Sequence, residues 1–272
     1  MMRGDMTQVA FIGAGKMASA MVRGLLVRHL YPPAQISCTG GSDPTGPALA
    51  AQTGITYETD PARLLRPADI VVLACKPQQL AGLDAAYTPL SNGKLVLSIL
   101  AGTPLAKLAA KFPDARNIVR AMPNTPGQIS AGITAWCSRA APTAADRAAI
   151  EGILGSLGVV LELPEAQLDA VTAVSGSGPA YLFEFAVAFR AAAVASGLPP
   201  ATAEKLAFET IRGAAKLLET SGEDPVKLRD AVTSPGGTTE AALKVFQAGH
   251  FRQIFADAVA AAKRRSEELA KL

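Results

Sequence analysis

The sequence predicts a doubly wound α/β domain followed by a second, all-α domain. In the first part, short runs rich in Val, Ile and Leu alternate with amphipathic or turn-rich segments. This alternation is typical of a mainly parallel sheet that helices cover on both faces. After Pro164 no period-two pattern remains, and Gly, Ser and Pro residues separate the predicted helices. We therefore expect residues 1–163 and 164–272 to form separate domains.

Seven apolar runs account for the strands of the first domain, and a helix connects the first two. The segment from Lys16 to Leu30 has apolar residues at helical spacing, which predicts that helix. The predicted strands are Val9–Ile12, Gln35–Thr39, Ile70–Cys75, Leu95–Leu100, Asn117–Ala121, Ile133–Cys137 and Val159–Leu163.

Three long helices are predicted in the second domain. The first, Ala180–Ser196, is apolar nearly all round, whereas 201–220 and 251–272 are amphipathic and rich in alanine. A helix that is apolar on every side must be buried on every side. A small helical domain supplies that burial most easily by pairing with a second copy of the chain. We expect a homodimer, or a larger oligomer built from dimers.

Composition excludes several classes of function. The 272 residues carry a net charge of only +3, which argues against a nucleic-acid partner. The three cysteines have no CxxC spacing, and the only histidines are His29 and His250, so we expect no disulfide framework and no metal site. We read the cysteines as reduced, partly buried thiols.

Neither a signal peptide nor a membrane span is expected. The apolar run at the start of the chain leads straight into glycines. The longest apolar segment, 180–195, carries both Glu184 and Arg190, which argues against a membrane helix. These observations predict a cytoplasmic protein.

A dinucleotide-binding turn is predicted directly after the first strand. Gly13 permits a tight turn, Gly15 lets the backbone approach a pyrophosphate, and Ala18 lets helix and strand pack closely. The pyrophosphate would lie at the positive N-terminus of the following helix. The expected cofactor-binding residues of this turn are Gly13, Gly15, Lys16 and Met17. The alternative is a glycine-rich turn that binds no ligand.

The end of the second strand bears on the choice of dinucleotide. An NAD-specific site usually has an acid at this position to bind the ribose 2′-hydroxyl. Here Thr39 is followed by two glycines and Ser42, and Asp43 comes a few positions late. The missing acid favours NADPH, although no Arg or Lys follows the strand to hold the 2′-phosphate. We expect Thr39 and Ser42 to contact that phosphate weakly, with NADH as the alternative cofactor.

Four further segments make the sequence distinctive. Together with residues 12–18, in this order and at these separations, they resemble pyrroline-5-carboxylate reductase over essentially the whole chain. The most specific of them is the D-x-V-x-S-P-G-G-T-T run. The segments are LACKPQ at 73–78, RAMPNTP at 120–126, SGSGPAY at 175–181 and LRDAVTSPGGTT at 228–239.

The resemblance implies a Rossmann-like N-terminal domain and a helical C-terminal domain that binds substrate and interlocks with a partner subunit. It implies NAD(P)H as the hydride donor and L-1-pyrroline-5-carboxylate, a small cyclic imine, as the acceptor. The sequence departs from the common family pattern at 39–42, where many members carry an Asn-Arg pair, and this concerns cofactor preference. Ala74, Lys76 and Pro77 are expected to border the nicotinamide and its ribose.

A loop of small polar residues that leads into a helix suits the substrate carboxylate, because amides and hydroxyls at a helix N-terminus bind anions. By resemblance, the Ser234 hydroxyl and the Gly237 and Thr238 amides would hold that carboxylate. Gly236 belongs to the same loop, and the Thr239 hydroxyl would face the ring nitrogen as the catalytic group. We expect the loop to come from the partner chain.

Two other functions compete with this interpretation. One is a related reductase, acting on a β-hydroxyacid or on another cyclic imine. A hydroxyacid enzyme would need a base, typically a lysine on the interdomain helix, and the 175–181 segment has none. The other is a binding protein that senses the nucleotide without turnover.

Overall fold

The computed structural model describes residues 7–41 and 43–271, which form two compact units. The first unit comprises the chain up to residue 177 and residues 262–272, and the second comprises 178–261. The sequence-based boundary near Pro164 stays a prediction.

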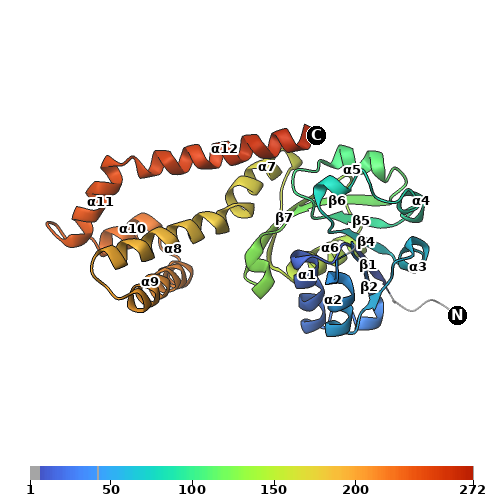
Figure 1. Cartoon of the computed structure of the whole chain (residues 1–272). Coiled ribbons are helices and arrows are strands. Elements are labelled where there is room, and N and C mark those ends of the chain that lie inside the picture. The colour runs from blue at the N-terminus through green and yellow to red at the C-terminus, as the bar shows by residue number, and fades with distance from the viewer. Residues whose placement is uncertain (1–6, 42, 272) are drawn as a thin grey trace. The chain divides into compact units, whose positions relative to one another are not determined.

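The first unit is built on an eight-stranded sheet with the order β3-β2-β1-β4-β5-β6-β7-β8 (Figure 1). All neighbouring strands are parallel except β6 and β7. The order reverses direction at β1, which makes the sheet doubly wound as predicted. The strands are β1 (Val9–Ile12), β2 (Ile36–Thr39), β3 (Thr56–Tyr57), β4 (Ile70–Leu73), β5 (Leu95–Ser98), β6 (Asn117–Met122), β7 (Gly132–Ser138) and β8 (Gly158–Glu162).

Both faces of the sheet are covered, because successive side chains of each strand point to opposite sides. Val9 and Phe11 of β1 pack in one apolar cluster with α1 (Lys16–Val27), α2 (Thr45–Thr53) and α6 (Ala144–Gly155). Ala10 and Ile12 pack in the other with α3 (Pro61–Leu65), α4 (Tyr87–Leu90), α5 (Leu105–Lys111) and α7 (Leu168–Val171). The short 3-10 helices are η1 (Pro33–Gln35), η2 (Pro77–Gln79), η3 (Thr125–Ile129) and η4 (Glu165–Gln167), and η5 (Thr172–Gly176) is a π-helical turn.

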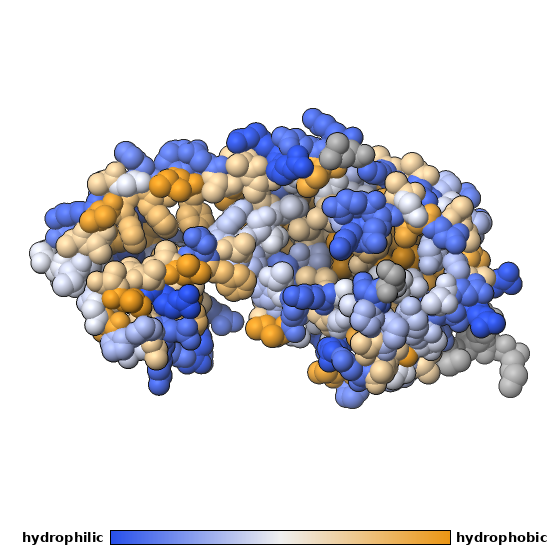
Figure 2. Space-filling view, in the orientation of Figure 1, coloured by the Kyte–Doolittle hydropathy of each residue, from blue (hydrophilic) through white to orange (hydrophobic). Residues whose placement is uncertain are grey.

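The second unit is entirely helical, as predicted. Its helices are α8 (Gly178–Ala195), α9 (Pro200–Ser221), α10 (Pro225–Ala231), α11 (Thr238–Ala248) and most of α12 (Phe251–Lys271). No residue of α8 is buried within one chain. Apolar side chains therefore lie on the surface of this unit, as Figure 2 shows.

All three cysteines lie in the first unit. Cys38 and Cys137 are buried free thiols, and Cys75 is a half-buried free thiol.

Candidate active site

The turn after β1 can be formed only by glycine at position 13. Gly13 has a φ of +113°, which disfavours any L side chain, and its amide donates to the Thr39 carbonyl at 3.0 Å. A Cβ atom at this position would lie 2.5 Å from the carbonyl oxygen of Ala74. The turn is therefore pressed against the end of β4, which fixes where α1 begins.

Open space lies where a pyrophosphate would bind. Gly15 is the N-cap of α1, and a Cβ added to it would meet nothing within 4 Å. The first-turn amides of α1 have no partner within the helix, so they and the helix dipole favour an anion there. Ala18 is only 1% exposed, as close packing of helix against strand requires. The residues of this turn thus fit a dinucleotide.

The end of β2 offers little to a 2′-phosphate. Thr39 is only 7% exposed. Burial raises the pKa of Tyr87, and the nearby Thr39 hydroxyl partly offsets that rise. Asp43 accepts hydrogen bonds from the amide of Thr45, at 2.9 Å, and from its hydroxyl. These bonds, with a smaller effect of the Lys76 charge, hold the pKa of Asp43 below its usual value. Ser42, the other predicted contact, lies outside the described residues.

The segment after β4 follows the carboxyl edge of the sheet, where ligands bind in such folds. Ala74 is half-buried, and its amide donates to the Ile12 carbonyl at 2.8 Å. Lys76 and Pro77 are exposed, and the Lys76 amide donates to the side-chain oxygen of Gln79 at 2.9 Å. Burial raises the pKa of the neighbouring Cys75 thiol. The three predicted nicotinamide contacts thus lie together after β4.

The loop after β6 is held by Asn124. Its side-chain oxygen accepts a hydrogen bond from the Ile133 amide at 2.9 Å, which ties the loop to β7. Gly176, in the π-helical turn, leaves room for Met122, since a Cβ there would lie 2.5 Å from the Met122 Cε atom. Asn124 and Gly176 therefore shape this edge of the first unit.

The Ser234–Thr239 loop forms a tight turn at the N-terminus of α11. Gly236 has a φ of +71°, and its amide donates to the Glu240 carboxylate at 2.9 Å. The Gly237 amide donates to the Ser234 carbonyl at 3.0 Å. In this conformation both glycine amides brace the turn, so the role of Gly236 and Gly237 as substrate donors stays a prediction.

The first-turn amides of α11 are better placed to bind an anion. Thr238 is the first residue of the helix, and its N-cap, Gly237, has no side chain that could cap it. The amides of Thr238 and Thr239 have no partner within the helix. Ser234 is exposed and Thr239 half-exposed, so their hydroxyls can be reached from solvent.

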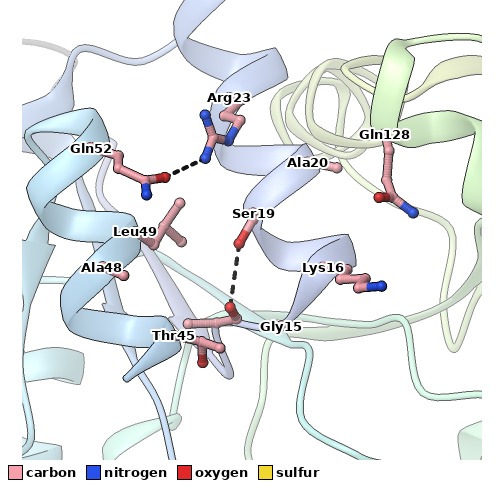
Figure 3. A pocket seen from close by; sticks show the side chains of 11 residues that line it. Gly15, Lys16, Ser19, Ala20, Arg23, Thr45, Ala48, Leu49, Gln52 and Gln128 are labelled. Carbon is pink, nitrogen blue, oxygen red and sulfur yellow. Dashed lines mark hydrogen bonds between the residues drawn. The ribbon is translucent and has the colours of Figure 1, made fainter. Parts of the chain in front are cut away.

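Sequence reasoning missed a groove between α1 and α2, which has a volume of about 360 Å³. Arg23, Thr45 and Gln52 line it together with Lys16 (Figure 3). These residues come from two helices that are separate in the sequence, and no motif joins them. The only available signal was the spacing of Lys16, Ser19 and Arg23, which places them on one side of a helix.

Two family models match parts of this chain. Residues 165–269 match the model for pyrroline-5-carboxylate reductase dimerisation, and residues 8–102 match that for coenzyme F420-dependent NADP oxidoreductase.

Full-length relatives carry the same family name. The pyrroline-5-carboxylate reductase of Pseudomonas aeruginosa is 41% identical, over 97% of this chain and 97% of its own length. A solved structure of this reductase from Coxiella burnetii has a TM-score of 0.89 at 35% identity, covering 98% of this chain and 100% of that one. The structure of the Plasmodium falciparum pyrroline carboxylate reductase, solved with NADP bound, has a TM-score of 0.87 at 29% identity. It covers 97% of this chain and 98% of that one. On its sequence, its two-part fold and these relatives, the chain belongs to the pyrroline-5-carboxylate reductase family.

Proposed function

We propose that the protein catalyses the last step of proline biosynthesis, the reduction of L-1-pyrroline-5-carboxylate to L-proline with NADPH. The proposal rests on a turn that has room for a dinucleotide, in a chain that aligns with pyrroline-5-carboxylate reductases over nearly its whole length. When bound, the cofactor supplies the hydride for the imine carbon. NADH is the alternative donor.

The cofactor is held by the first unit. The space beside Gly15 and the N-terminus of α1 take the pyrophosphate, with Gly13, Lys16 and Met17 in the same turn. Ala74, Lys76 and Pro77 border the nicotinamide and its ribose. Catalysis then depends on orientation and electrostatics, because a protonated imine is already electrophilic and needs no strong general acid.

The substrate is held by the loop of the second unit. The Thr238 and Thr239 amides and the Ser234 hydroxyl receive the carboxylate at the positive end of α11. The Thr239 hydroxyl forms a hydrogen bond with the ring nitrogen and so fixes which atom faces the hydride donor. Each proline formed consumes one hydride and one proton, the latter already on the imine nitrogen.

We further propose that the protein acts as a homodimer, or a larger oligomer of dimers, and that a second copy supplies the Ser234–Thr239 loop. The 165–195 segment is long and apolar enough to cross a membrane, yet only 6% of its most apolar stretch is buried in one chain. The dimerisation family model spans the same residues, which favours a second copy over lipid as the covering surface. We propose a cytoplasmic location.

Sedimentation velocity at micromolar concentration tests the assembly. Phe183 is 66% exposed on α8, so Phe183→Glu should dissociate the oligomer, whereas Arg212→Glu on an exposed face of α9 should not. A wild-type protein that sediments as a monomer would contradict the proposal.

Deuterium transfer tests the reaction. With NADPH that carries deuterium at both positions of nicotinamide C4, and pyrroline-5-carboxylate as substrate, proline should carry one deuterium at C5. Unlabelled proline would exclude direct hydride transfer, and no proline at all would exclude the reaction.

A further inference from the structure

Selection of NADPH requires a positive group near the 2′-phosphate, and the described residues at the end of β2 provide none. Thr39 is buried and uncharged, and Gly40 and Gly41 have no side chains. Asp43 is an exposed carboxylate that would repel a phosphate. A cation must therefore come from another element of the first unit.

The groove between α1 and α2 runs beside this strand end. Its near end is formed by Gly15 of the dinucleotide turn and by Thr45, the first residue of α2 (Figure 3). Its far end is closed by a hydrogen bond of 2.5 Å from the Arg23 guanidinium to the Gln52 side-chain oxygen. The near end thus adjoins both the pyrophosphate position and the loop that follows β2.

Lys16 is the available cation at this near end. It is the first residue of α1, it is exposed, and it forms no salt bridge with any described residue. Arg23 lies two turns further along the helix and is already bonded to Gln52. Lys76, which follows β4, has only a small electrostatic effect on Asp43, and the proposed function places it at the nicotinamide ribose.

Lys16 would reach the groove entrance by a rotation of its side chain. In Figure 3 its side chain extends out of the groove, on the side away from Thr45. A lysine has a flexible four-carbon stem and three donors, so rotation of the side chain can bring the ammonium over the groove entrance. The Thr45 hydroxyl, which now donates to Asp43, is a second donor at the same entrance.

We propose that Lys16 selects NADPH over NADH by pairing with the 2′-phosphate at the groove entrance, with the Thr45 hydroxyl as a second contact. Lys16 thereby replaces the cation that is missing after β2. The inference rests on dinucleotide binding, which the proposed function also requires, but not on the identity of the imine.

Binding measurements test this without turnover. The dissociation constants of NADP⁺, NAD⁺, adenosine 2′,5′-bisphosphate and AMP are measured by calorimetry for the wild type and for Lys16→Gln, Lys16→Arg and Lys107→Gln. Lys107 is an exposed lysine on α5, away from the groove-lining residues, and serves as the matched control. Comparable melting temperatures establish that the variants are folded.

The expected result is selective for the phosphate. Lys16→Gln should raise the dissociation constants of NADP⁺ and of the bisphosphate about tenfold, the size of one charge-assisted contact. It should change those of NAD⁺ and AMP less than about twofold. Lys16→Arg should retain most of the wild-type affinity for NADP⁺, and Lys107→Gln should not change the affinity for any of the four ligands. Raising the salt concentration should reduce the preference for NADP⁺ in the wild type but not in Lys16→Gln.

Two results would overturn the proposal. Equal weakening of NADP⁺ and NAD⁺ by Lys16→Gln would place the lysine on the pyrophosphate, which both cofactors share. Unchanged binding of NADP⁺ would remove Lys16 from the site. Failure of the imine reaction itself would leave these binding differences intact, so it is distinguishable from failure of the inference.

Discussion

Arg120 and Asp169 form an ion pair of 2.9 Å inside the first unit, between Nη2 of the guanidinium and Oδ1 of the carboxylate. The Arg120 side chain is only 6% exposed and also pairs with Glu165 at 3.3 Å. The same Asp169 oxygen accepts a hydrogen bond from the Ser266 hydroxyl at 2.8 Å. Asp169 therefore connects β6 and α7 with the last turns of α12.

Removing the arginine should destabilise the protein, because Glu165 and Asp169 lose the buried guanidinium that pairs with both of them. Arg120→Met is expected to lower the free energy of unfolding by about 2 kcal/mol, the size of a hydrogen bond between charged groups. Urea denaturation at fixed protein concentration measures this. Arg63→Met is the control, since its pair with Asp60 is exposed and should contribute less than about 1 kcal/mol. Equal effects of both variants would show that the buried pair contributes no more than a surface one.

The two glycines of the dinucleotide turn should respond differently to alanine. The methyl group that Gly15→Ala adds would meet no atom within 4 Å, and the residue has an ordinary φ, so the fold should survive. The methyl group would occupy the space of the pyrophosphate and so weaken cofactor binding. Gly13→Ala should damage the fold as well, because the new Cβ would lie 2.5 Å from the Ala74 carbonyl oxygen. Melting temperature and NADP⁺ binding are measured for both variants. Unimpaired binding by folded Gly15→Ala would mean that the pyrophosphate does not approach this residue.

The Thr239 hydroxyl, rather than its bulk, should matter for the reaction. Thr239→Val keeps the shape and removes the hydroxyl, so we expect kcat/KM for the imine to fall about 100-fold, with NADP⁺ affinity unchanged. Thr239→Ser should retain most of the activity. Steady-state kinetics at saturating NADPH measures these effects. Full activity of Thr239→Val would refute the hydrogen bond to the ring nitrogen.

The Cys38 thiol should make stability fall at alkaline pH. Burial raises its pKa from the ordinary value of 9.0 to about 11, so between these values the unfolded thiol ionises while the folded one keeps its proton. Stability due to this group is therefore complete below pH 9 and declines as the pH rises towards 11. Relative to Cys38→Ala, the wild type should lose about 1 kcal/mol between about pH 7 and pH 10. A constant difference between the two proteins over this range would contradict the shift.

Much of the fold followed from local pattern. All seven predicted strands are present, and the sheet buries most residues of each apart from β8, which is largely exposed. β3 was missed, since two residues carry no periodicity. The π-helical turn of Thr172–Gly176 was also missed, because its register depends on packing against Met122.

The site was predictable where the backbone dictates the residue. Gly13 and the loop before α11 could be identified, because Gly13 and Gly236 have positive φ angles that favour glycine. The groove at Lys16 and the ion pair of Arg120 could not be identified from the sequence, since each joins elements that are separated in the chain. Thr39 was expected to face the cofactor, and its burial depends on tertiary packing, which a local sequence pattern does not reveal.

The most direct test of the account is the oxidation of NADPH and NADH, followed side by side by nicotinamide absorbance, with pyrroline-5-carboxylate as substrate. We predict rapid oxidation with proline as the product, and a higher kcat/KM for NADPH than for NADH. A folded protein that binds NADP⁺ but oxidises neither cofactor with this imine would contradict the account.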